Sequence, residues 1–404
     1  MDINKRDLLL SGLTVGAGLA ASSAVAQPAP PAAAGGPRVR GGIDQGATSE
    51  NSGIQPSTVD LNYKPRRVNK MIELWEDGQP IYYTHDGVSP DMTADEVFEH
   101  GKKMAKTYCD GIEYNVEHGP LDFTAFANFM QGLKAGGPTK SGHATPAVWV
   151  IPPIQCLSEE YALANSWVIG NFLDLGAHGI SIVHSRSAAA MEVYAQQAAR
   201  YPFDYPNTPS VGKRQGLGLR GAAAAAPAIW GITGNKYLHV ADVWPLNPRG
   251  EIMIGVKIED KFAVANAAEV LAVKGICFGE VGQQDNVYSM FGLSAFPENQ
   301  AGGRGAPGAG APGAGAPGAG APGAGGPGAG GPGAGRTPEQ EAAFQAMRNK
   351  VVPLFNKNKI MMFDAPPRGM SFEDQLKAGG MIFGGNSEDR VRQQREFTKR
   401  KMPV

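Results

Sequence analysis

The chain lacks an excess of charge of either sign. Among its 404 residues, Lys and Arg number 37 and Asp and Glu number 38, which gives a formal net charge of −1. Proteins that bind nucleic acid or an anionic membrane surface through their overall charge need a basic excess. The composition therefore argues against both kinds of partner.

Cysteine is also scarce. The three cysteines, Cys109, Cys156 and Cys277, are odd in number and far apart, and no Cys-x-x-Cys or Cys/His zinc spacing occurs. Each lies in or beside a predicted strand, which favours buried thiols over a disulfide. The Gly-x-Ser-x-Gly pattern is missing too, so no nucleophile motif supports a serine hydrolase.

Long apolar runs are absent after the first 26 residues. There, the basic segment 5–7 precedes an apolar run, 8–21, and the small residues 24–26. This order is typical of an export signal peptide. The segment resembles a twin-arginine signal with Lys5 in place of the first arginine. We predict export to the periplasm with cleavage of residues 1–26 and no stable membrane insertion afterwards; an uncleaved anchor is the alternative.

Two segments are dominated by small residues and proline. Residues 27–65 are rich in Pro, Gly, Ala, Ser and Asn, which predicts a disordered tether. Residues 302–335 repeat Gly-Ala-Pro-Gly-Ala with a period of five, whereas collagen requires glycine at every third position. We interpret 302–335 as a flexible insertion within a domain of residues 66–400, either inert or acting as a loose lid.

Strand and helix patterns alternate through that domain. The expected strands cover residues 80–85, 111–116, 147–151, 179–184, 252–259, 275–285, 359–363 and 380–384. The expected helices cover residues 68–74, 93–106, 123–135, 161–175, 188–200, 261–273, 338–355, 371–378 and 387–401. Eight such alternations predict an α/β fold, a (β/α)8 barrel, interrupted by an excursion at 201–250.

Acidic residues close two neighbouring apolar runs. Glu259 ends the run at 252–259, and Asp285 ends the run at 275–285. Adjacent strands of a parallel barrel present such carboxylates at one mouth, where they can bind one divalent ion. Imidazoles at other strand ends make Mg, Mn or Co a better match than structural zinc. Each carboxylate could instead cap a helix or shape a turn.

A lysine and several polar residues belong to the same predicted mouth. Lys257 lies two positions before Glu259, so both side chains point to the same face. Lys257 could hold a substrate carboxylate, attack a carbonyl if its pKa is lowered, or form an ion pair with Glu259. The other polar residues expected at strand ends are His85, Asn115, Glu117, His118 and His184.

Several motifs occur in an order that resembles the HpcH/HpaI aldolase/citrate lyase family. They are Glu117-His118-Gly119-Pro120-x-Asp122, Gly218-Leu-Arg-Gly221, Ile258-Glu259, Ala263-Val-x-Asn266, Val273-x-Gly275 and Gly282-x-x-Asp285. The 26 positions between Glu259 and Asp285 are similar to the spacing of the family's metal ligands. The resemblance implies a barrel of the phosphoenolpyruvate/pyruvate type, a homo-oligomer that is often hexameric, and metal-dependent lyase activity.

The resemblance also implies roles for individual residues. Glu259 and Asp285 would bind Mg or Mn, which would chelate a pyruvate-like 2-oxo acid and stabilise its enolate. His118 would move the proton of the aldol hydroxyl. Backbone amides after Gly282 would fix the substrate carboxylate. Apart from the resemblance, we expect that His184 contributes to substrate binding.

The chain departs from the family pattern at three positions. Asn115 replaces the aspartate that pairs with the histidine, and it can orient His118 but not charge it. Ile151 replaces an arginine that grips the substrate carboxylate, and Lys257 replaces a neutral residue. We hypothesise that Lys257 supplies the missing positive charge.

The expected function is aldol cleavage of a 4-hydroxy-2-oxo acid through a pyruvate enolate. The alternative is a metal-binding barrel that has lost aldolase activity and that binds an organic acid or serves as a scaffold.

Overall fold

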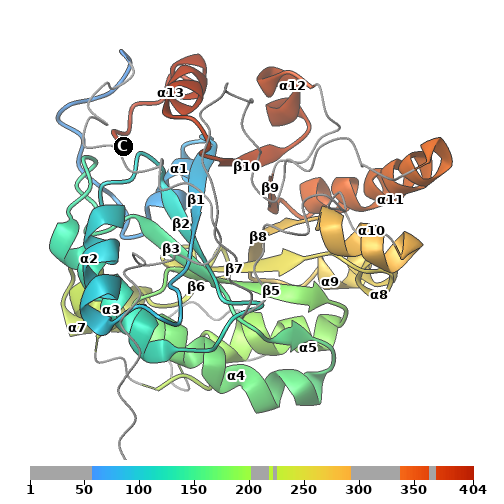
Figure 1. Ribbon diagram of the computed structural model, residues 1–404, viewed down its shortest axis with the longest axis horizontal. Coiled ribbons are helices and arrows are strands. Elements are labelled where there is room, and N and C mark those ends of the chain that lie inside the picture. Colours follow the sequence, from blue (N-terminus) through green and yellow to red (C-terminus); the bar gives the residue numbers. More distant parts are fainter. Residues whose placement is uncertain (1–56, 202–217, 222–224, 293–336, 364–369) are drawn as a thin grey trace, which may run out of the picture. The chain divides into compact units, whose positions relative to one another are not determined.

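A closed ring of parallel strands forms the centre of the protein (Figure 1). The computed structural model describes residues 57–201, 218–221, 225–292, 337–363 and 370–404. Eight strands pair in the order β1-β2-β3-β5-β7-β8-β9-β10, and β10 pairs with β1 to close the ring. All of these pairings are parallel. The predicted (β/α)8 barrel is confirmed.

The ring strands lie close to their predicted positions. They are β1 Ile81–Asp86, β2 Gly111–Asn115, β3 Ala147–Ile151, β5 Gly179–Ser185, β7 Ile252–Lys257, β8 Ile276–Glu280, β9 Met361–Phe363 and β10 Gly380–Gly384. Two strands of two residues lie beside the ring: β4 (Gln155–Cys156) pairs with β5, and β6 (Val243–Trp244) pairs with β7.

Helices occupy the connections between strands. They are α1 Lys70–Glu76, α2 Ala94–Met104, α3 Phe123–Gly136, α4 Glu159–Asp174, α5 Ala188–Val193, α6 Ala226–Trp230, α7 Gly234–Val240, α8 Lys261–Ala265, α9 Ala267–Val270, α10 Gln283–Phe291, α11 Pro338–Lys357, α12 Phe372–Lys377 and α13 Glu388–Phe397. Side-chain caps begin several of them. Thr93 caps α2 and forms a capping box with Glu96.

The structure divides two helices that the sequence predicted as continuous. The helix expected at 188–200 is α5 followed by a π-helix, Tyr194–Ala198. The helix expected at 261–273 is interrupted at Asn266, whose side chain donates a hydrogen bond to the backbone oxygen of Arg186. Asparagine favours such breaks because its amide competes with the helical backbone for hydrogen bonds.

Aromatic side chains fill the interior of the barrel. The ring of Tyr83 lies 5.3 Å from those of Trp149 and Phe363, and Trp149 lies 6.1 Å from Phe278. Residues of α1, including Trp75, pack into the same apolar cluster. The interior is thus a packed core, and polar side chains gather beyond it at the carboxyl ends of the strands.

Several sequence-based expectations concern residues outside the described ranges. These are the signal peptide at 1–26, the insertion at 302–335 and most of the tether at 27–65. Of that tether, the described residues 57–65 contact the C-terminal segment: Thr58 Oγ1 donates to the Arg400 oxygen at 2.7 Å, and the Asp60 amide donates to the Lys401 oxygen at 2.9 Å.

The three cysteines are buried and free, as predicted. None of the helices in the described ranges combines the length and apolar character needed to cross a bilayer.

Candidate active site

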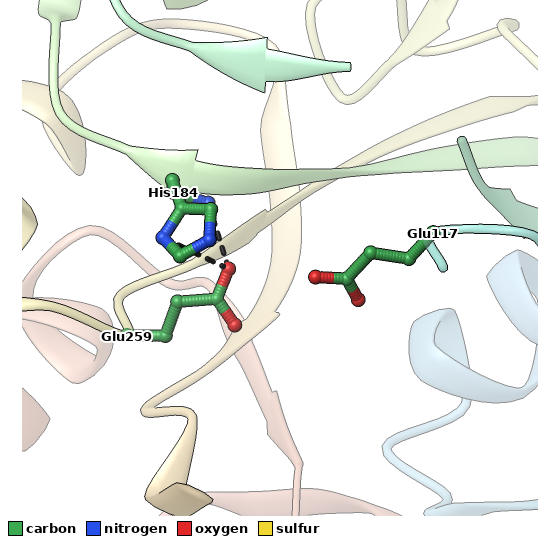
Figure 2. A group of neighbouring side chains, drawn as sticks. All are labelled: Glu117, His184 and Glu259. Atoms are coloured by element: carbon green, nitrogen blue, oxygen red, sulfur yellow. Dashed lines mark hydrogen bonds and ion pairs between the residues drawn. The ribbon is translucent and has the colours of Figure 1, made fainter. Parts of the chain in front are cut away.

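Three side chains from different strands meet at the mouth of the barrel (Figure 2). Glu117 follows β2, His184 lies near the end of β5, and Glu259 follows β7. Each offers one possible ligand atom, and these three atoms lie within 4.8 Å of one another. Within the described residues, this group is the cluster with the composition and spacing of a metal site. It contains Glu259 and His184 from the sequence prediction and adds Glu117, which had no assigned role.

Glu259 lies at the centre of this group and is fully buried. Its Oε1 accepts a hydrogen bond from the backbone amide of His184 at 2.7 Å, and its Oε2 lies 3.0 Å from Lys257 Nζ. A Cβ atom at Gly282 would lie only 2.6 Å from the Cβ of Glu259. Gly282 is therefore needed so that the start of α10 can approach Glu259.

His184 is held in an unusual backbone conformation. Its φ of 45° lies in the left-handed region, which non-glycine residues seldom adopt outside turns and functional sites. Its Nδ1 lies 2.8 Å from Asp260 Oδ2, an oxygen that also accepts a hydrogen bond from Arg186 Nε at 2.9 Å. The hydrogen bond to Asp260 raises the pKa of His184, with Glu259 adding to the effect and burial opposing it.

Asp260 fixes the chemistry of that imidazole. His184 and Arg186 hold the pKa of Asp260 far below its usual value against the opposing effect of burial, so Asp260 is ionised and can only accept. Nδ1 of His184 must then carry the proton it donates. Nε2 is left as the nitrogen that can bind a metal or move a proton, the arrangement commonly found behind metal-binding histidines.

Lys257 is enclosed by carboxylates. Its Nζ lies 2.8 Å from Glu117 Oε2, 3.0 Å from Glu259 Oε2 and 3.7 Å from Glu280 Oε1. Burial alone would lower the pKa of Lys257, but the charges of Glu259, Glu280 and Glu117 outweigh it and hold that pKa well above its usual value. This environment disfavours the alternative of an uncharged lysine that attacks a carbonyl. The alternative of an ion pair with Glu259 is confirmed.

The predicted place of Asp285 at the end of a strand is wrong. β8 ends at Glu280, and Asp285 lies in the first turn of α10, because the chain turns at Gly282 and begins a helix there. The mouth nevertheless influences Asp285: burial and the charge of Glu259 raise its pKa, while Lys257 and His184 oppose them. Asp285 is not one of the three clustered residues.

The two residues expected to handle protons are peripheral. The side chain of His118 is 77% exposed, and its Nε2 lies 3.6 Å from Glu117 Oε1. Asn115 Oδ1 accepts the backbone amide of Glu117 at 3.0 Å, so Asn115 shapes the turn that carries Glu117. Asn115 ends β2 and His118 follows it closely, so both residues lie beside the mouth. Asn115 was expected to orient His118, but its hydrogen bond goes to the backbone of Glu117 instead.

The donor set fits a divalent metal. Among the described residues, Glu117 Oε1 and Glu259 Oε2 are buried carboxylate oxygens that accept no hydrogen bond, although Glu259 Oε2 is ion-paired with Lys257 at 3.0 Å. One ammonium among three carboxylates leaves a buried excess of negative charge that a metal cation would offset. Two carboxylates and one imidazole are ligands that Mg, Mn or Co accept. Glu117, His184 and Glu259 are the residues that would hold such an ion, with Asp285 nearby in α10.

Comparisons with known proteins give similarity in structure alone. No family model and no curated protein matches the sequence. A HpcH/HpaI aldolase/citrate lyase family protein from Burkholderia cenocepacia J2315 is 15% identical, with 82% of this chain and 98% of that chain covered and a TM-score of 0.48. A HpcH/HpaI aldolase from Desulfitobacterium hafniense DCB-2 is 14% identical, with 80% of this chain and 92% of that chain covered and a TM-score of 0.46.

A third solved structure is the citrate lyase β subunit from M. tuberculosis, complexed with oxaloacetate and magnesium. It is 11% identical, covers 78% of this chain and 96% of that chain, and has a TM-score of 0.37. At these values the likeness carries no argument about activity, and the barrel rests on its own strand pairing. The solved structures to which this chain is similar include HpcH/HpaI aldolase/citrate lyase family proteins, the family that its motifs resemble.

Proposed function

We propose that the protein is a metal-dependent carbon–carbon lyase that acts on a 4-hydroxy-2-oxo acid. One observation carries the proposal: Glu117, His184 and Glu259 present ligand atoms within 4.8 Å of one another at the end of the barrel where such enzymes place their active sites. The excess of carboxylates over cations around Lys257 supports a metal cation there. When bound, a divalent ion would polarise the carbonyl of a 2-oxo acid and acidify its C3 protons.

The chain's own residues would bind and orient the substrate. The N-terminus of α10, at Gly282, presents backbone amides that favour a carboxylate, since the positive end of the helix dipole lies there. The ammonium of Lys257 adds positive charge beside Glu117 and Glu259. Asp260 holds His184 in one tautomer, and aromatic side chains around Trp149 pack the barrel interior.

A barrel that binds an organic acid without catalysis is the second candidate. The observation that favours it is the environment of Lys257, whose charge is already balanced by neighbouring carboxylates. Ile151, where the resembled family has arginine, is 3% exposed and provides no compensating charge. Substrate affinity would then depend more heavily on the metal and on α10.

Three features of the proposal extend beyond the site. We propose Mg or Mn as the metal, a homo-oligomer as the functional form, and export to the periplasm as the destination. These predictions follow from the donor set and from the sequence. Metal analysis of purified protein, sedimentation of the full chain and fractionation of the producing cell would check them.

Exchange of pyruvate methyl protons with solvent deuterium tests the proposed function. With Mn or Mg, the wild-type protein is expected to exchange these protons, because a lyase of this kind must form the enolate. Glu259→Gln is expected to abolish exchange while the fold persists. NMR follows the methyl signal. Binding of pyruvate without metal-dependent exchange would support the second candidate instead.

A further inference from the structure

A histidine–carboxylate pair lies inside the barrel, apart from the three clustered residues. His85 of β1 and Glu113 of β2 are direct partners in the parallel register. His85 Nδ1 lies 2.6 Å from Glu113 Oε1. The side chain of His85 is 11% exposed and that of Glu113 is 6% exposed. A contact of this kind fixes the orientation of the ring and leaves Nε2 able to accept or donate a proton.

Strand alternation places this pair between the aromatic core and the mouth. His85 is two positions after Tyr83, so both side chains point into the barrel, and their rings contact edge to face at 4.9 Å. Glu113 is in register with Trp149 on its other side. The aromatic layer thus lies beneath the pair, and the charged mouth lies beyond it.

The charged groups that influence His85 come from three strands. Burial alone would lower the pKa of His85, but Glu113 of β2 outweighs it and Glu280 of β8 adds to the rise, while Lys257 of β7 opposes them. Lys257 and Glu280 are register partners at the mouth. Glu280 is two positions after Phe278, whose ring contacts Trp149 in the aromatic layer, so the side chain of Glu280 points into the same interior as that of His85.

The remaining ring nitrogen distinguishes His85 from a histidine that is merely packed. Nε2 of His85 is buried and has no hydrogen-bond partner among the residues that the structure describes. A structural histidine in a core normally satisfies both nitrogens, because an unpaired buried polar atom costs about 1–3 kcal/mol. Groups kept at such a cost are often those that meet a substrate.

We propose that His85, oriented by Glu113, is the catalytic acid–base group of this barrel, an inference that rests on the lyase function proposed above. It would perform the task that the family resemblance assigns to His118. His118 is largely exposed, and its neighbour Asn115 hydrogen-bonds elsewhere. His85, in contrast, has a carboxylate partner and is largely buried.

The proposed step conserves atoms and electrons. In cleavage, Nε2 of neutral His85 takes the proton of the substrate's 4-hydroxyl group. The electrons of that O–H bond form the new carbonyl, the C3–C4 bond breaks, and its electron pair remains on the 2-oxo acid as an enolate. His85 then returns the proton to C3, which completes the 2-oxo acid and restores the neutral imidazole. No oxidant, reductant or further reactant is consumed.

Solvent-deuterium exchange into pyruvate with Mn, measured in two variants, tests this assignment. His85→Gln is expected to lower the exchange rate by about 100-fold or more, the range of general acid–base catalysis, while Mn affinity stays within about twofold. Glu113→Gln keeps an oxygen that can accept from Nδ1 but removes the charge that raises the pKa of His85. Its rate is therefore expected to fall less, with the acidic limb of the pH profile displaced to lower pH.

Controls separate this inference from the proposed function. His239→Gln, at an exposed position of α7, should leave exchange unchanged, and His118→Gln should lose less than His85→Gln. Wild-type protein that fails to exchange would overturn both proposals. Wild-type exchange that persists in His85→Gln, or a pH profile that does not move in Glu113→Gln, would overturn the assignment of His85 alone. If His85→Gln fails to fold, Glu113→Gln decides the question.

Discussion

The two ends of the barrel both bury charge, but they balance it differently. At the amino ends of the strands, Asp110 lies among Lys70, Arg395 and Arg400, so one carboxylate meets three cations. At the carboxyl ends, Lys257 lies among Glu117, Glu259 and Glu280, so one cation meets three carboxylates. The first cluster joins distant parts of the chain, and the second resembles a binding site.

The contacts of Asp110 show why the amino end is structural. Asp110 precedes β2 and accepts the amide of Tyr82 at 3.0 Å and Nη1 of Arg400 at 2.7 Å. Arg395 Nη2 donates to Asp110 at 3.1 Å. The cluster therefore ties the first strands to the C-terminal segment. In barrels of this kind, residues at the amino end serve stability and residues at the carboxyl end serve function.

The mouth differs because its carboxylates are not fully satisfied. Among the described residues, Glu117 and Glu259 each keep a buried oxygen without a hydrogen bond, of which that of Glu259 is ion-paired with Lys257, whereas both carboxylate oxygens of Asp110 accept hydrogen bonds. An unbalanced acidic cluster weakens the folded state unless a cation binds it. Both ends bury charged side chains, so burial alone does not distinguish them. The candidate site is the end at which carboxylates outnumber cations.

The largest effect on stability is expected at the amino end. Asp110→Asn should lower the free energy of unfolding by about 3–5 kcal/mol, because it removes the charge that three buried cations share. Urea denaturation measures this change. Arg395 and Arg400 outweigh burial and hold the pKa of Asp110 far below its usual value. The stability from Asp110 is thus present above its unfolded pKa of about 3.9 and is lost as the pH falls below it.

Asp110→Asn also tests whether the two ends are independent. Folded variant protein should keep wild-type Mn affinity, since the ion-pair partners of Asp110 are Lys70, Arg395 and Arg400 rather than residues of the mouth. A variant as stable as the wild type at pH 7 would show that the cluster at the amino end contributes no net stability.

A smaller effect of opposite sign is expected at the mouth. Burial, Glu259, Glu113 and Glu117 raise the pKa of Glu280 to about 7 against the opposing charge of Lys257. Because the folded pKa is above the unfolded one, the stability from protonated Glu280 is lost as the pH rises through about 7. Glu280→Gln should then be more stable than the wild type at pH 8 by about 2 kcal/mol, and equally stable near pH 4.

Thermal or urea unfolding in EDTA at both pH values would measure the Glu280→Gln effect. Glu269→Gln, at an exposed position of α9, is the matched control, and its stability should differ little from that of the wild type at either pH. A Glu280→Gln protein that is less stable at pH 8 than the wild type would contradict this prediction. It would mean that the ion pair of Glu280 with Lys257 stabilises the fold by more than repulsion from the neighbouring carboxylates destabilises it.

The smallest expected effect concerns the support of His184. Asp260→Asn should weaken Mn binding by about tenfold, as for other residues that orient a metal-binding histidine. Its amide oxygen can still accept from the amides of Phe262 and Ala263, so α8 should keep its cap. Isothermal titration with Mn, with circular dichroism as the folding control, measures the change. Unaltered affinity would remove His184 from the metal site.

Much of the fold follows from local sequence signals. Alternating apolar strands and capped helices predicted all eight ring strands, because short buried strands are bounded by clear turn residues. The sequence patterns predict no helix or strand within the excursion at 201–250, yet its described residues include α6, α7 and β6. Its short elements lack the periodicity that longer amphipathic helices show. The break at Asn266 depends on a hydrogen bond to Arg186, which is distant in sequence.

The site was harder to predict than the fold. Spacing alone paired Glu259 with Asp285, and it could not show that β8 ends at Glu280. Glu117 joins the cluster because β2, β5 and β7 converge at the mouth, a relation that no local motif records. The carboxylates around Lys257 likewise come from the carboxyl ends of three strands, β2, β7 and β8. The motif that begins at Glu117-His118 was the available signal, and the family resemblance assigns a role to His118 rather than to Glu117.

Titration with Mn, followed by electron paramagnetic resonance, tests the central claim most directly. If the mouth carboxylates hold one divalent ion, wild-type protein should bind one Mn per chain, and Glu259→Gln should bind it at least about 100-fold more weakly, with its fold intact. Equal affinity in the two proteins would contradict the account, as would a wild-type protein that binds no Mn.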